Sequence, residues 1–314
     1  MGDILVGTCS WTDRRLVASG WYPAGRRGAE GRLRYYAERF PVVEVDATYY
    51  ALPGERNSRL WAERTPDGFV FDVKAFSLLT GHPTRSAVMP GGLPADARDP
   101  GVLDEVWARF ADGITPLWQA GRLGSVLFQF PPWFRPGERA EAFLAATARR
   151  TEGWPVAVEF RHPAWWQEGR SEDTAALLER YGMAAVAVDM IQTLPSSVPP
   201  TAHVTSSRLS VVRFHGRSAA WGTGSKEERF RYAYSESELA EWLPRLRALA
   251  ERAEQVHVLF NNCCGDAAVR DAAAMARLLG PADPTPTAAA APPSAAQHLP
   301  RRRAAAPPGG ESER

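Results

Sequence analysis

Eight short apolar runs alternate with helix-like segments along the chain, and this alternation constrains the fold more than any other feature. The runs are rich in Val, Phe and Ile, and they span Ile4–Trp11, Val42–Tyr49, Phe69–Ala75, Ser125–Phe130, Val156–Arg161, Ala184–Met190, Ser210–His215 and Val256–Asn261. Helical periodicity occurs between most of them, in Arg32–Phe40, Gly101–Ala120, Gly137–Glu152, Glu172–Tyr181, Glu236–Glu254 and Asp266–Leu279. Strands that alternate with helices predict parallel β/α units.

Eight β/α units in about 280 residues match the usual size of a closed (β/α)₈ barrel. We therefore predict an α/β fold of the TIM type, with residues 1–280 as a single barrel domain. A doubly wound open sheet is the alternative, but no Gly-rich GxGxxG turn follows the first run. The segment between the sixth and seventh runs contains Pro195, Pro199 and Pro200. Proline disfavours helix, so we expect helix 6 to be missing or reduced to a turn.

Residues 281–314 differ in composition from the rest of the chain. Eighteen of these 34 residues are Ala or Pro, and Leu299 is the one large aliphatic residue among them. Such a segment buries too little apolar surface to offset the entropy lost on ordering. We predict a disordered C-terminal tail.

Polar residues stand near the carboxyl end of nearly every predicted strand. With the two-residue period of a strand, they are Thr8, Ser10, Glu44, Asp46, Asp72, Lys74, Gln129, Glu159, Arg161, Asp189, Arg213, His215 and Asn261. Strands of a parallel barrel are covered on both faces, so charges there need partners or a ligand. The predicted strand-to-helix loops are also the longer ones, and barrel enzymes build their sites from those loops. We predict a site at the C-terminal mouth; the alternative is an ion-pair network that only closes the barrel.

The strings that contain these residues resemble the YecE-like family, also called domain of unknown function 72. The strings are GTCSW, YYAERFPVVEVDATYY, FVFDVKA, LFQFPPWF, AVEFRHPAWW, VRFHGR and VLFNN. The resemblance implies a TIM-type barrel and supplies no established reaction. It places the family's characteristic residues on the strand ends identified above. In the usual pattern of the family Asn and Phe stand where this chain has Asp46 and Tyr49.

Acid–base chemistry is the first interpretation of the strand ends. The candidate catalytic residues are Glu159, Asp189, His215, Glu44 and Lys74. Neighbouring carboxylates can separate into an acid and a base when burial and charges split their pKa values, and His carries protons near neutral pH. A buried lysine can form a Schiff base, but Lys74 is more simply explained by pairing with Asp72, Glu44 or Asp46.

Binding is the second role expected of the mouth. The candidate substrate-binding residues are Ser10, Asp46, Tyr49, Gln129, Arg161, Arg213, Asn261 and Asn262. Arg213, Arg217 and the turn from Asn261 to Asp266 resemble the place where barrel enzymes often hold phosphate. Nothing in the sequence requires a cofactor. If a divalent metal such as Mg²⁺ or Mn²⁺ is bound, its ligands are expected among Glu44, Glu159, Asp189 and His215.

We predict an enzyme that uses carboxylate and His acid–base chemistry on a small polar or anionic substrate, such as a sugar or a phosphorylated compound. The alternatives are a divalent-metal phosphodiesterase acting on nucleic acid, and a ligand-binding barrel without catalysis. A net charge of +1 mildly disfavours nucleic acid. No run is long enough to span a membrane, the N-terminus lacks a signal-peptide pattern, and three cysteines make no disulfide framework. These features predict a cytoplasmic protein with a small-molecule partner and no membrane contact.

Overall fold

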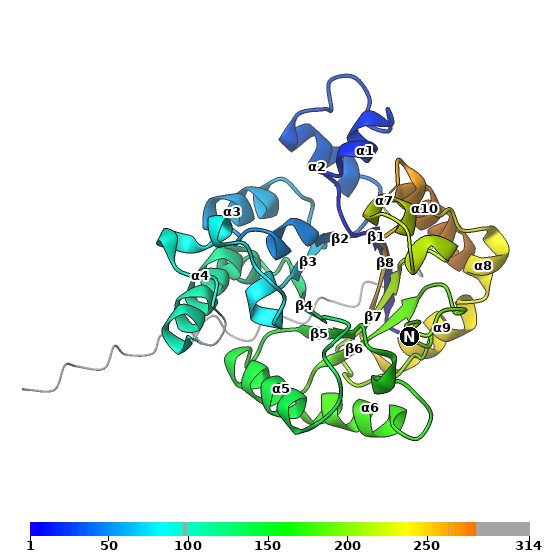
Figure 1. Cartoon of the computed structure of the whole chain (residues 1–314). Helices are drawn as coiled ribbons and strands as arrows, with labels where there is room; N and C mark the ends of the chain where they lie inside the picture. The colour runs from blue at the N-terminus through cyan, green and yellow to red at the C-terminus, as the bar shows by residue number, and fades with distance from the viewer. Residues whose placement is uncertain (97–98, 263, 281–314) are drawn as a thin grey trace, which may run out of the picture. The chain divides into compact units, whose positions relative to one another are not determined.

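The computed structural model describes residues 1–96, 99–262 and 264–280. Eight parallel strands form a closed barrel in chain order, with β8 pairing back onto β1 (Figure 1). The strands are β1 Asp3–Thr8, β2 Val42–Val45, β3 Val70–Lys74, β4 Leu123–Phe130, β5 Val156–Phe160, β6 Ala184–Asp189, β7 Leu209–Phe214 and β8 Gln255–Phe260. The predicted barrel is confirmed; the predicted disordered tail, 281–314, lies outside the described residues.

Helices surround this barrel (Figure 1). The longer ones are α2 Ala29–Ala37, α3 Glu55–Glu63, α4 Pro100–Gln119, α5 Glu138–Arg150, α6 Ser171–Arg180, α9 Leu243–Arg252 and α10 Ala267–Leu279; α1 Arg14–Ala18, α7 Lys226–Arg229 and α8 Glu236–Ala240 are short. No helix lies between β6 and β7, as the prolines predicted. The sequence missed α3, which has only two large apolar side chains, Leu60 and Trp61, among its nine residues. Within the described residues, no helix combines the length and the apolar character that a membrane span requires.

The loops differ in length at the two ends of the barrel. Residues 75–99 join β3 to α4, and residues 215–235 join β7 to α8. The return connections are short, such as residues 120–122 before β4 and 253–254 before β8. The predicted asymmetry is confirmed, and the long loops stand at the carboxyl ends of the strands, where a barrel carries its site.

Strand register determines which side chains enter the barrel. Arg213 on β7 is level with Val188 on β6, whereas Phe214 is level with Asp189. Paired residues on neighbouring strands share a face, and successive residues alternate. Arg213 points into the barrel, as its contacts with β2 and β5 show, so Phe214 and Asp189 point outward to the helices.

Candidate functional site

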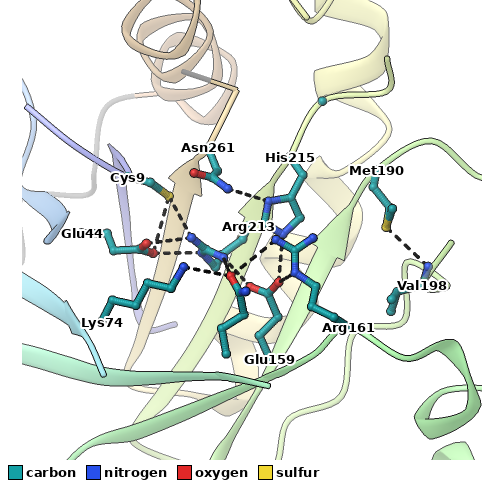
Figure 2. A network of polar contacts seen from close by, with 12 residues as sticks. Cys9, Glu44, Lys74, Glu159, Arg161, Met190, Val198, Arg213, His215 and Asn261 are labelled. Atoms are coloured by element: carbon teal, nitrogen blue, oxygen red, sulfur yellow. Dashed lines mark hydrogen bonds and ion pairs between the residues drawn. The ribbon is translucent and has the colours of Figure 1, made fainter. Parts of the chain in front are cut away.

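Arg213 lies at the centre of the barrel mouth and connects three strands (Figure 2). Its Nε and Nη2 donate to the two oxygens of Glu44 on β2, at 2.9 and 2.7 Å, and its Nη1 donates to Glu159 Oε2 on β5 at 2.5 Å. All three side chains are buried. Paired, charge-assisted bonds of this kind are the strong ones, so Arg213 is held rigidly. Burial opposes ionisation of Glu159, but Arg161 and Arg213 outweigh it and hold the pKa of Glu159 well below its usual range.

His215 contacts Oε1, the other carboxylate oxygen of Glu159. Its Nε2 is 3.1 Å from Glu159 Oε1, and its Nδ1 is 2.9 Å from the amide nitrogen of Asn261. An ionised carboxylate only accepts, so Nε2 carries the proton and Nδ1 accepts from Asn261. Burial, aided by Arg161, lowers the pKa of His215 to about 3, so the ring is neutral at pH 7. Both ring nitrogens are therefore engaged within the site.

Arg161, Lys74 and Arg213 converge on one uncharged oxygen. Gln129 Oε1 on β4 is 3.0 Å from Lys74 Nζ, 3.4 Å from Arg213 Nη1 and 3.5 Å from Arg161 Nη2. Arg161 also forms an ion pair with Glu159 through Nε, which is close to Oε1 but poorly aligned for a hydrogen bond. Three cations thus face two carboxylates in this network, and their surplus charge is directed at an amide.

Lys74 has no carboxylate partner among the described residues. Asp72, two residues earlier, accepts from His257 Nδ1 at 2.9 Å inside the barrel, and Glu44 is held by Arg213. The pairing of Lys74 with Asp72 or Glu44 that the sequence suggested is therefore wrong. Burial, with Arg213 as the next contributor, lowers the pKa of Lys74 to about 8. Its ammonium lies 4.7 Å from the centre of the Tyr49 ring.

The site has two levels, which we call the floor and the mouth cluster. The floor consists of the fully buried Glu44, Glu159, Arg213 and His215. The mouth cluster consists of the partly exposed Lys74, Gln129, Arg161 and Asn261. A ligand at the mouth would therefore meet two cations and two amides first, with the carboxylates beneath them.

Aromatic side chains line the mouth. The rings of Tyr49 and His82 are 5.2 Å apart, and the His82 ring is 5.8 Å from that of Trp133, which is 60% exposed. Arg161 lies 5.5 Å from the ring of Trp221. Burial, followed by Lys74, lowers the pKa of His82 to about 4, so His82 adds no charge to this rim. Flat rings beside cations and amides are suited to contacts with a small organic ligand.

The sequence-based prediction exchanged the inward and outward side chains of β1. Cys9, not Thr8 or Ser10, enters the floor, with Sγ 3.5 Å from Glu44 Oε2 and from Arg213 Nη2. The Thr8 hydroxyl instead contacts Tyr36 at 3.0 Å, and the amide of Thr12 donates to the Ser10 hydroxyl. Polarity marked Thr8 and Ser10, but the register of β1 against β2 decides the face. Cys9 and the buried His257 are thus the inward residues that sequence reasoning missed.

Asp189 and Asn262 are also placed outside the mouth. Asp189 accepts from Tyr234, Trp242 and Arg217, each at 2.7 Å, on the helix side of the barrel wall. Asn262 donates to the carbonyl of Tyr232 and to Asp271 behind β8. Their predicted places beside the other site residues are wrong, because their side chains point away from the barrel interior. Arg217, drawn outward by Asp189, likewise leaves the predicted phosphate site.

The displacement of Asp189 breaks up the metal-ligand set considered from the sequence. Glu44, Glu159 and His215 share the floor, but both carboxylates are occupied by Arg213. Among the residues that the structure describes, no three His, Cys, Asp or Glu side chains are grouped to hold a metal ion. The donors present in the floor therefore fit an arginine rather than a divalent cation.

Ser10 and Asp46 line a separate cavity of about 150 Å³. It lies among β1, β2, α2 and α3, and Trp11, Trp61 and Arg64 also line it. None of its lining residues belongs to the mouth cluster or the floor. The structure thus brings together eight of the predicted residues and Tyr49, and it separates four; the eight are Glu44, Lys74, Gln129, Glu159, Arg161, Arg213, His215 and Asn261.

Comparison with known proteins finds similar chains of the same size. The model of a family described as "Protein of unknown function DUF72" matches residues 5–297. UPF0759 protein YunF of Bacillus subtilis (strain 168) is 32% identical over 282 residues, which cover 88% of this chain and 94% of YunF. UPF0759 protein YecE of Escherichia coli (strain K12) is 29% identical over 145 residues, 45% of this chain and 46% of YecE.

Two solved structures share the fold. A DUF72 family protein from Enterococcus faecalis V583 superposes with a TM-score of 0.74 at 24% identity, over 90% of this chain and 99% of that one. A DUF72 family protein from Thermotoga maritima MSB8 gives a TM-score of 0.73 at 29% identity, over 88% and 98% of the two chains. The barrel is therefore common to these proteins.

Proposed function

The chain belongs to the DUF72 family, and we propose that it is an enzyme that binds a small anionic substrate at the C-terminal mouth of its barrel. One observation carries the proposal: three cations converge on the single neutral oxygen of Gln129. A carboxylate or phosphate group carries the negative charge that balances the surplus positive charge of this cluster, whereas a neutral amide oxygen carries none. Sugar phosphates and other small phosphorylated or carboxylated compounds carry such a group.

The surroundings support a substrate that is partly organic. Two aromatic rings flank the mouth cluster. Tyr49 lies beside Lys74, and Trp221 lies beside Arg161. An anion held by Arg161 would place its carbon skeleton against these rings. Aromatic walls with a few convergent polar groups are typical of small-molecule sites.

Proton transfer is assigned to Lys74, with Glu159 and His215 beneath it. The pKa of Lys74 is lowered to about 8, which lies near the pH at which an enzyme works. Glu159 stays ionised because Arg161 and Arg213 overcome its burial, and His215 is neutral with both nitrogens engaged. These two residues therefore orient the cations, and Lys74 is the group free to exchange a proton.

Binding measurements test this proposal. Isothermal titration and thermal unfolding would compare inorganic phosphate and glucose 6-phosphate with uncharged glucose. The phosphates are expected to bind and to raise Tm, and Arg161→Gln is expected to weaken them about tenfold, or about 1.4 kcal/mol. Arg277→Gln, an exchange at a side chain that is 68% exposed, is the matched control and should change nothing.

Equal binding of glucose and glucose 6-phosphate, or no effect of Arg161→Gln, would contradict the anion site. Assays of turnover with the compounds that bind then separate an enzyme from a barrel that only binds its ligand.

A further inference from the structure

Lysine is almost absent from this chain, and one of its two lysines is in the mouth cluster. Lys and Arg total 37, and of these only Lys74 and Lys226 are lysines. The other cations of the site, Arg161 and Arg213, are arginines. A guanidinium remains protonated in proteins and is no nucleophile, whereas an unprotonated amine is one. Lys74 therefore supplies a chemistry that the arginines around it do not.

The surroundings of Lys74 raise the fraction of unprotonated amine above that of an ordinary lysine. Its Nζ donates to the neutral Gln129 Oε1 at 3.0 Å, and no carboxylate within the described ranges is close enough to pair with it. Arg213 and Arg161 disfavour a further positive charge, while Glu44 and Glu159 partly compensate for them. Burial is the largest influence, and it lowers the pKa to about 8. At pH 7 about a tenth of the molecules carries a free amine there.

The amine of Lys74 is also directed at the proposed ligand position. Lys74 is partly exposed, and Figure 2 shows it extending toward the centre of the polar network. Its Nζ and Arg161 Nη2 both contact Gln129 Oε1, so a ligand bound by Arg161 would lie beside the amine.

We propose that Lys74 forms an imine with a small aldehyde or ketone that carries a carboxylate or phosphate group. The inference rests on the proposed anion site and names the substrate class for it. Arg161 and the amides of Gln129 and Asn261 hold the anionic group, and the carbonyl carbon faces Nζ.

The step balances without an oxidant, a reductant or a second substrate. The lone pair of Nζ forms a bond to the carbonyl carbon, the C=O π electrons move to oxygen, and a proton from nitrogen ends on that oxygen. The resulting hydroxyl leaves as water with the second proton of the nitrogen, which leaves the C=N double bond, and a proton from solvent then gives the protonated imine. A protonated imine keeps the positive charge at the position of the ammonium, 4.7 Å from the Tyr49 ring, where a cation–π contact stabilises it.

Reductive trapping tests the inference on the full chain. The protein would be incubated at pH 7.5 with pyruvate, with glyceraldehyde 3-phosphate or with uncharged glyceraldehyde, each together with sodium cyanoborohydride, and peptides would be mapped by mass spectrometry. The expected result is a reduced adduct on Lys74, because a pKa near 8 leaves about a hundredfold more free amine at pH 7.5 than the value near 10.4 of an ordinary lysine does. Pyruvate and glyceraldehyde 3-phosphate distinguish a carboxylate from a phosphate as the anionic group.

The variants are Lys74→Arg, which keeps the charge but not the nucleophile, and Lys226→Arg as the control. Loss of the adduct in Lys74→Arg and its retention in Lys226→Arg support the inference. Adducts only at Lys226 or at the N-terminal amine overturn it. Equal trapping of glyceraldehyde and its phosphate at Lys74 overturns the requirement for an anionic group.

Failure of this inference is distinguishable from failure of the anion site. Inorganic phosphate has no carbonyl group, so its binding depends on the anion site alone. Phosphate binding without any adduct on Lys74 refutes the imine and retains the anion site. Absence of both refutes both.

Discussion

Replacing Gln129 with Glu places a carboxylate where the structure has three cations around an amide oxygen. The new oxygen would lie 3.0 Å from Lys74 Nζ and within 3.5 Å of Arg213 and Arg161. At an effective dielectric constant of about 20, each pair contributes about 5 kcal/mol of attraction. The loss of hydration and repulsion from Glu159, its neighbour across β4 and β5, oppose this gain.

We expect the opposing contributions to leave a net stabilisation of about 2 kcal/mol, close to the value of hydrogen bonds to charged groups. For a domain of this size each kcal/mol raises Tm by about 2–4 °C, so the variant should melt about 4–8 °C higher than the wild type. The internal carboxylate also competes with a bound anion. Phosphate affinity should fall at least tenfold, or about 1.4 kcal/mol.

Thermal unfolding and isothermal titration with inorganic phosphate measure both effects. Gln119→Glu is the matched control, because it makes the same change of charge at an exposed residue at the end of α4, where the chain enters β4. The control should leave phosphate binding unchanged. If Gln129→Glu melts lower than the wild type and binds phosphate as well as it does, the convergence of cations on Gln129 does not mark an anion site.

Three further outcomes follow from the same geometry. Arg213→Met leaves Glu44 and Glu159 buried without their main partner, so the free energy of unfolding in urea should fall by about 3–5 kcal/mol; a loss under 1 kcal/mol would contradict a central role for Arg213. Because the pKa of His215 is lowered to about 3, the unfolded chain binds its proton first, and the stability of the wild type should fall relative to His215→Asn as the pH drops from about 6.5 to 4.5; parallel curves in urea titrations would refute this. Asp189→Asn should cost about 1–3 kcal/mol of stability, since Tyr234, Trp242 and Arg217 lose a charged acceptor, and it should leave phosphate affinity within about twofold; a large loss of binding would return Asp189 to the site.

The sequence predicted the barrel and most of the site because both depend on local pattern. Each apolar run was long enough to be a strand, and the charged residues at the ends of β2, β5 and β7 stood among Val and Phe that made their phase plain. Strand β6 offered no such contrast. Val186 and Val188 face inward while Ala185 and Ala187 face outward, so both faces are apolar and Asp189 could belong to either. Alternation defines which residues share a face, but only pairing with a neighbouring strand defines which face is inside.

The same reasoning explains the errors at Ser10 and Asn262. Ser10 lies on the outward face with Thr8, and Asn262 on the outward face with Phe260, because the two-residue alternation continues past the last residue of each strand. A polar side chain there forms hydrogen bonds with neighbouring groups. Ser10 accepts one from the Thr12 amide, and Asn262 donates one to Asp271. Contacts with residues that are distant in sequence, like the one between Asn262 and Tyr232, depend on how the loops fold over the barrel.

The two charged networks at this end of the barrel differ in how their charge is balanced, and this difference separates structure from function. On the helix side, Arg217 meets three carboxylates, Asp189, Glu238 and Glu241, and Asp189 also accepts from Tyr234 and Trp242. That network is complete without a ligand, and it fastens β6 to the loop and helices that follow β7. Inside the barrel the balance is reversed, because the cations outnumber the carboxylates and share the oxygen of an amide. Incompletely paired buried charge lowers the stability of a protein. Such destabilising arrangements are characteristic of sites that bind ligands. The composition of the interior network is therefore that of a site that binds an anion, whereas the exterior network holds neighbouring elements of the fold together.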